Sequence, residues 1–151
     1  MIKRSLPIVF LLAYSLASFN CSNPVENKDG VYFPGGKYYY SGFDSAGILV
    51  SQGWFSIEYT DSVNFTGTWQ IDKLMPNADI GPQTGSGELI GNLDSLTVSI
   101  GLNPDMVDNN VFLRGTYMEQ EGLSGEWTYS GFPGILNRGT FKAYRSESES
   151  N

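Results

Sequence analysis

The feature that most constrains the fold is a repeated alternation of apolar and polar residues with a period of two, over residues 37–145. The clearest case places Leu96, Val98, Ile100 and Leu102 on one face. Such alternation is typical of a strand with one buried face. The gaps between these segments are too short for helical crossovers, so consecutive strands are expected to pair antiparallel. Eight strands are expected, over residues 37–43, 48–59, 63–71, 84–90, 96–102, 111–117, 123–129 and 139–143.

An eight-stranded meander normally closes into a barrel, because closure removes the exposed strand edges. The predicted fold class is therefore all-β: an antiparallel up-and-down β-barrel that follows a helical signal peptide and a flexible tether. The expected boundaries are 1–20 for the signal peptide, 21–36 for the tether, 37–145 for the barrel and 146–151 for a disordered tail. The tail alternates Ser and Glu and is too polar to pack.

A short motif recurs in three of these segments: an apolar residue, a glycine two positions later and an aromatic residue four positions later. Its copies are Phe65, Gly67 and Trp69; Leu113, Gly115 and Tyr117; and Leu123, Gly125 and Trp127. Inward glycines let a strand coil sharply or make room for a large neighbour. Two interpretations stay open: a filled, strongly curved barrel, or a cavity floored by the aromatic residues. The candidate ligand-binding residues are Phe65, Gly67, Trp69, Leu113, Gly115, Tyr117, Gly125 and Trp127.

The register of one hairpin follows from parity. For the second and third motifs to share a face, the loop between them must hold an odd number of residues. A three-residue loop, residues 119–121, pairs Gly115 with Gly125 and places Trp127 inside the barrel. Gly122 is then available for a positive φ angle.

The N-terminal segment has the anatomy of a signal peptide: Lys3 and Arg4, then an apolar stretch of about 14 residues, which is too short to span a bilayer. The only cysteine, Cys21, follows it in the sequence Leu16-Ala17-Ser18-Phe19-Asn20-Cys21. This arrangement resembles the bacterial lipoprotein family, in which such a cysteine is lipidated. Phe19 and Asn20 depart from the small residues of the usual pattern. The resemblance implies a cell-envelope protein held on a membrane by lipid on Cys21, in the outer membrane if the host has one.

The barrel segment also resembles the calycin group, the lipocalins and avidins, in its eight meandering strands. The resemblance is architectural, because the lipocalin Gly-x-Trp motif is missing from the first strand. It implies a barrel that holds a small ligand inside.

Loops at the two barrel ends differ in predicted length. Short loops are expected at 60–62, 91–93 and 119–121, and long ones at 74–83, 103–109 and 131–136. An even strand number places both ends of the barrel segment at the short-loop end. The long loops carry exposed apolar candidates for a mouth, namely Met75, Ile80, Met106, Phe132 and Ile135. Three roles stay open for these loops: they plug the barrel end, they form a mouth that admits an apolar ligand, or they form a docking surface for another protein.

Composition excludes several function classes. The chain has no histidine, which removes histidine-dependent catalysis and metal sites. Without the leader's Lys3 and Arg4, seven basic residues face 16 acidic ones, a net charge of −9. Because the basic residues are scattered, we expect no nucleic-acid partner. We also expect no metal, no cofactor and no enzymatic activity.

The sequence therefore predicts a lipid-anchored envelope barrel that binds a small apolar or amphipathic ligand through its long-loop mouth. The alternative is an envelope interaction protein, an inhibitor or assembly factor, with a solid, plugged barrel and docking loops.

Overall fold

The computed structural model describes residues 33–106 and 108–146. The signal peptide, Cys21, most of the tether and nearly all of the tail lie outside the described residues. Eight strands make up the described chain and confirm the predicted all-β class: β1 (Gly36–Asp44), β2 (Leu49–Tyr59), β3 (Asn64–Lys73), β4 (Gly85–Asp94), β5 (Thr97–Gly101), β6 (Asn109–Met118), β7 (Gly122–Gly131) and β8 (Gly134–Arg145). The described residues contain no helix with the length and hydropathy that crossing a membrane requires.

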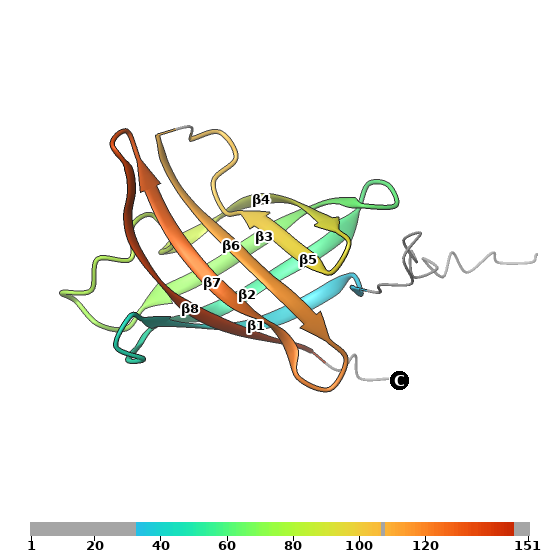
Figure 1. The fold of residues 1–151 in the computed structure, drawn as a ribbon, viewed down its shortest axis with the longest axis horizontal. Coiled ribbons are helices and arrows are strands. Elements are labelled where there is room, and N and C mark those ends of the chain that lie inside the picture. The colour runs from blue at the N-terminus through green and yellow to red at the C-terminus, as the bar shows by residue number, and fades with distance from the viewer. Residues whose placement is uncertain (1–32, 107, 147–151) are drawn as a thin grey trace, which may run out of the picture.

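The strands form one closed barrel in the order of the sequence (Figure 1). All neighbours pair antiparallel, and β1 closes on β8 from Tyr38 opposite Arg145 to Asp44 opposite Gly139. The start of β1, the end of β8 and the β6–β7 hairpin lie at the same end of the barrel (Figure 1). The predicted up-and-down meander is confirmed, with the architecture that the resemblance to calycins implied.

The predicted register of the β6–β7 hairpin is also confirmed. Gly115 lies opposite Gly125, and Leu113 lies opposite Trp127. The loop comprises residues 119–121, and Gly122 has a φ angle of 76°. Trp127 is fully buried in the barrel.

Two predicted loops are wrong. The predicted loop at 91–93 is strand, because β4 continues to Asp94 and buries Leu93. The turn that follows is residues 95–96, with Ser95 at φ 53°. The predicted long loop at 131–136 is a two-residue turn at Phe132 and Pro133, since β8 begins at Gly134. A register shift after Tyr129 breaks the alternation there, which concealed the strands in the sequence.

The barrel interior is a continuous apolar core rich in aromatic rings. Phe33 lies in this core at the end where β1 starts, although the predicted tether included it. Its ring packs 5.3 Å from those of Tyr38 and Tyr117. Its backbone carbonyl accepts a hydrogen bond from the Tyr59 hydroxyl at 2.8 Å. The segment just before β1 therefore closes this end of the barrel.

Candidate functional site

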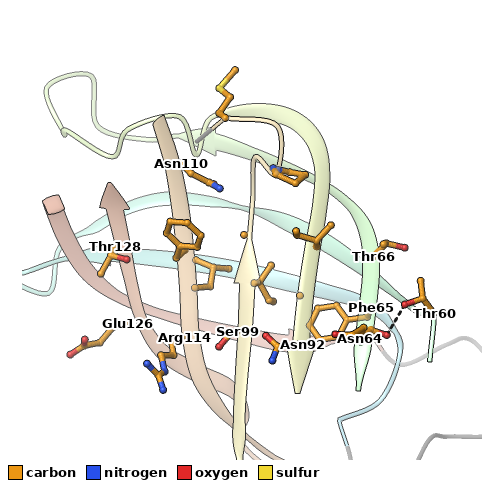
Figure 2. Close-up of a pocket in the computed structure, with 18 residues that line it drawn as sticks. Thr60, Asn64, Phe65, Thr66, Asn92, Ser99, Asn110, Arg114, Glu126 and Thr128 are labelled. Atoms are coloured by element: carbon orange, nitrogen blue, oxygen red, sulfur yellow. Dashed lines mark hydrogen bonds between the residues drawn. The ribbon is translucent and has the colours of Figure 1, made fainter. Parts of the chain in front are cut away.

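A groove of about 990 Å³ lies on the outer wall of the barrel, over β3 to β7 (Figure 2). Its outward side chains occupy two neighbouring rows that run across the strands. The registers of β3 through β7 define the first row, which comprises Thr66, Ile90, Gly101, Phe112 and Thr128. They define the second row as Asn64, Asn92, Ser99, Arg114 and Glu126. The groove therefore has an apolar row beside a polar one.

The apolar row is exposed at its centre. Ile90 and Phe112 are 51% and 45% exposed, although both lie within strands. Met106 and Pro104, from the loop after β5, extend this surface toward the long-loop end. Large apolar side chains that are contiguous and exposed are uncommon on a protein surface and mark interaction sites.

Gly101 forms the floor of the groove between Ile90 and Phe112, its two cross-strand neighbours. A Cβ atom at this position would lie 3.6 Å from the Phe112 ring and 3.6 Å from the Asn110 amide nitrogen, which is ordinary van der Waals contact. Gly101 therefore has room for a side chain, and the missing side chain gives the groove its depth.

The polar row supplies both donors and acceptors of hydrogen bonds. Asn92 and Ser99 are neutral, and Arg114 lies directly opposite Glu126 in the β6–β7 pairing. Asn64 and Thr60 border the same side, and the Thr60 hydroxyl donates a hydrogen bond to the Asn64 carbonyl oxygen at 3.1 Å (Figure 2). Strands hold all of the row's side chains, so their spacing is fixed by the sheet.

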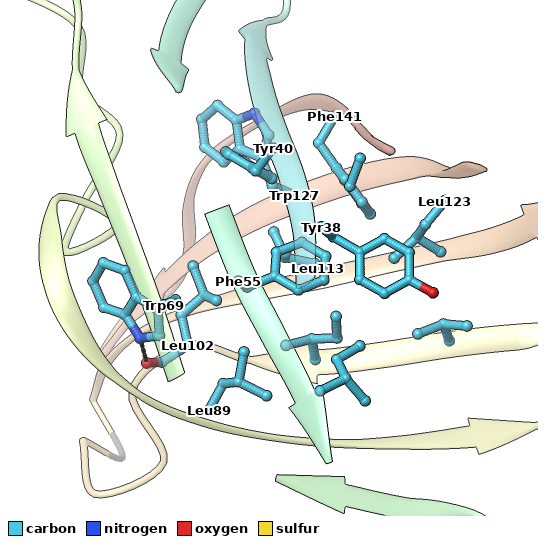
Figure 3. Close-up of a cluster of buried hydrophobic side chains, with 14 of the residues drawn as sticks. Tyr38, Tyr40, Phe55, Trp69, Leu89, Leu102, Leu113, Leu123, Trp127 and Phe141 are labelled. Atoms are coloured by element: carbon cyan, nitrogen blue, oxygen red, sulfur yellow. Dashed lines mark hydrogen bonds between the residues drawn. The ribbon is translucent and has the colours of Figure 1, made fainter. Parts of the chain in front are cut away.

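The predicted ligand-binding residues lie mainly in the barrel core (Figure 3). Trp69 and Trp127 are 2% and 0% exposed. The Trp69 indole N–H donates to the Leu102 carbonyl, and that of Trp127 donates to the Phe43 carbonyl at 2.8 Å. Tyr117 is partly buried against the same core. Of the predicted set, Phe65 and Leu113 also border the outer groove.

Backbone fills the space beside the three inward glycines of the motif. A Cβ atom at Gly67 would overlap the Ser56 carbonyl oxygen, and one at Gly115 would overlap that of Ser124. At Gly125 it would overlap the Arg114 carbonyl oxygen. This geometry favours the interpretation in which the glycines permit close approach of coiled strands.

The predicted mouth residues fall into two groups. Ile80 is buried and Gln83 is fully buried, so the β3–β4 loop folds into the barrel end. Met75, Met106 and Ile135 are 45%, 49% and 55% exposed, and Phe132 in the β7–β8 turn is 90% exposed. Met106 is the predicted mouth residue that borders the groove.

The plugging loop meets a small polar cluster inside the barrel. The Tyr40 hydroxyl donates a hydrogen bond to Gln83 Oε1 at 2.8 Å. Burial raises the pKa of this hydroxyl above its ordinary value. Gln83 Nε2 is buried without a hydrogen-bond partner among the described residues. The loop is therefore held by this buried hydrogen bond, by the buried side chain of Ile80, and by hydrogen bonds that the Asn103 and Asn137 side-chain amides donate to the Pro82 and Asp79 carbonyl oxygens.

Within residues 33–106 and 108–146 no cluster of three acidic or cysteine side chains is arranged to hold a metal ion. The chain matches no family model, and no curated protein or solved structure is significantly similar to it. The site is therefore interpreted from its own geometry.

Proposed function

We propose that this protein is an exported, lipid-anchored binding protein that holds a small amphipathic molecule in the groove on its outer wall. The observation that carries the proposal is the groove itself, where an exposed apolar row lies beside a row of hydrogen-bonding side chains. Its volume of about 990 Å³ is at the upper end of the range for small-molecule sites, roughly 300–1,000 Å³.

The chemistry of the two rows indicates the class of ligand. Burial of the exposed apolar area of Ile90 and Phe112 against an aliphatic or aromatic moiety would stabilise the complex by roughly 25 cal/mol per Å². The ligand's polar end would face Asn92, Ser99 and the Arg114–Glu126 pair, which together donate and accept hydrogen bonds. An amphipathic molecule satisfies both rows, whereas a purely apolar one would leave the polar row desolvated.

Two features support the outer groove over the barrel interior. Aromatic side chains and close strand contacts occupy the interior. Ile80 and Gln83 fill the long-loop end. A ligand can bind in the outer groove without displacing the aromatic core or the β3–β4 loop.

The groove can be tested with the amphipathic fluorescent probe anilinonaphthalene sulfonate. Wild-type protein is expected to enhance its emission, and Gly101→Leu is expected to weaken binding about tenfold, because leucine fills the floor between Ile90 and Phe112. Titration of probe fluorescence measures the affinity, and a melting curve checks that the variant is folded.

The matched control pair is Ile90→Ser and Leu96→Ser. Both remove an exposed aliphatic side chain, 51% and 61% exposed respectively, but Leu96 lies in the β4–β5 turn outside the groove. Loss of binding in Ile90→Ser alone supports the site. Equal binding by wild type, Gly101→Leu and Ile90→Ser would contradict it and favour the interaction-protein alternative, in which the long-loop end docks another protein.

Lipidation of Cys21 is tested separately. The mature protein is expected to begin at Cys21, to carry the added mass of its acyl chains and to sediment with membranes, because two or more acyl chains give stable anchoring. Cys21→Ser is expected to release the protein or to leave the leader uncut. Intact mass spectrometry decides: a mature N-terminus elsewhere, with no added acyl mass, would refute the lipoprotein proposal.

A further inference from the structure

Three aromatic side chains form one row on the outer wall of β2, β1 and β8, away from the groove. The register pairs Trp54 with Tyr39, and Tyr39 with Tyr144. Tyr39 and Tyr144 are 56% and 50% exposed, and Trp54 is half-buried. The other two of the three tryptophans, Trp69 and Trp127, are buried in the core.

Two cations lie beside this row on the same face. The Lys37 ammonium lies 4.3 Å from the centre of the Trp54 ring. Lys142 precedes Tyr144 by two positions on β8. Arg145 lies opposite Tyr38 in the register, so it shares the inward face and lies at the barrel rim beside Gly36. Within β1, β2 and β8, Glu58 is the acidic residue at this end.

Trp and Tyr together with Lys and Arg are the side chains that proteins place at a membrane–water interface. The rings are amphipathic and sit at the level of the lipid headgroups, and the long basic side chains reach the phosphates. Exposed aromatic rings flanked by two lysines thus complement the headgroup region of a phospholipid bilayer.

The position of this wall agrees with that occupant. Lys37 is the second residue of β1, at the barrel end where the chain enters from Cys21. Cys21 precedes Phe33 by 12 residues, which can span at most about 40 Å. Lipid on Cys21 would therefore hold this end of the barrel within reach of the bilayer.

We infer that the barrel lies on its membrane through this wall, with Tyr39, Trp54 and Tyr144 among the headgroups and Lys37 and Lys142 on the phosphates. The inference rests on the proposed lipid anchor. The negative net charge does not oppose it, since charges more than about 8 Å apart are largely screened at physiological ionic strength. The groove over β3 to β7 would then face away from the bilayer and stay accessible.

Trp54 provides the test, because the other two tryptophans are buried. The mature protein is mixed with vesicles of phosphatidylglycerol and phosphatidylcholine whose acyl chains are brominated. Bromine is expected to quench the emission of Trp54, relative to unbrominated vesicles. Trp54→Phe should abolish the quenchable fraction.

The charge contribution has a matched control. Lys37→Glu with Lys142→Glu is expected to lower the bromine-quenched fraction of Trp54 several-fold, because each basic residue near an anionic surface contributes several-fold to the attraction while the acyl chains keep the protein on the vesicle. Lys73→Glu with Arg138→Glu changes the net charge equally but at the long-loop end of the barrel, distant from the aromatic row, and should be quenched as wild type is. Equal loss of quenching by both pairs would overturn the inference.

Two further outcomes would also overturn it. One is an unquenched Trp54 that stays accessible to iodide in the presence of vesicles. The other is protection of Trp54 by a soluble polysaccharide but not by vesicles, which would assign the wall to a glycan. The intact mass of the same sample tests the lipid anchor independently. A protein without acyl chains would refute the anchor, whereas quenching of Trp54 by added vesicles would still test whether this wall contacts the membrane.

Discussion

Gly125→Ala is expected to lower the melting temperature by about 10 °C, because one extra methyl group overpacks the tightest contact between β6 and β7. A Cβ atom at Gly125 would overlap the Arg114 carbonyl oxygen and the Gly115 Cα atom, both of which are backbone. Backbone can yield only if the strands separate, and β7 is hydrogen-bonded to β6 on one side and β8 on the other. Gly125→Leu should be at least as destabilising.

Gly101→Ala is the matched control, since the added Cβ atom there would make only ordinary van der Waals contacts, at 3.6–3.7 Å, with the Asn110 and Phe112 side chains. It should melt within a few degrees of wild type. Differential scanning calorimetry of both variants measures the difference. If Gly125→Leu melted normally but lost binding of an apolar ligand, the glycines would line a cavity and the close-approach interpretation would be wrong.

The sequence was informative wherever alternation and parity act together. Gly115 and Gly125 were paired correctly because the side-chain period of a strand is two, so an odd loop alone puts both motifs on the same face. The inward position of Trp127 followed from the same rule. A similar signal was present in Leu89, Gly91 and Leu93, which continue the inward face of β4 beyond its predicted end.

The outer groove was not predicted, because it exists only after the strands are paired. Ile90, Gly101 and Phe112 are far apart in sequence and become neighbours through two separate registers. The available signal was that Ile90 and Phe112 are large apolar residues on the polar face of otherwise alternating strands. Alternation indicates which side chains face the core, but it gives no information on which outward side chains become neighbours across strands.

The sequence also does not indicate which apolar loop residues are buried. Ile80 and Phe132 are both apolar loop residues at the same barrel end, yet Ile80 is 2% exposed and Phe132 is 90% exposed. The β3–β4 loop is long enough to fold back into the barrel, where Gly81 packs against the ring of Tyr129. The two-residue β7–β8 turn has no such freedom, so its side chain points outward.

Trp127→Ala is expected to reduce the free energy of unfolding by about 3–5 kcal/mol, as large-to-small substitutions of fully buried aromatic residues do. The indole lies over Gly139 and opposite Leu113, so its removal leaves a cavity beside two strands. Its N–H also donates to the Phe43 carbonyl at 2.8 Å, which links β7 to β1 across β8. Chemical denaturation gives the free energy of unfolding for the variant and the wild type.

Trp127→Phe separates the two contributions. Phenylalanine keeps most of the apolar volume but cannot donate to Phe43, so we expect a smaller loss of about 1–3 kcal/mol. Trp54→Phe, on the outer wall, should leave the free energy of unfolding nearly unchanged. If Trp127→Ala unfolded with the same free energy as wild type, the stability of the barrel would not depend on this ring. The interior would then have room for the ligand that we propose binds in the outer groove.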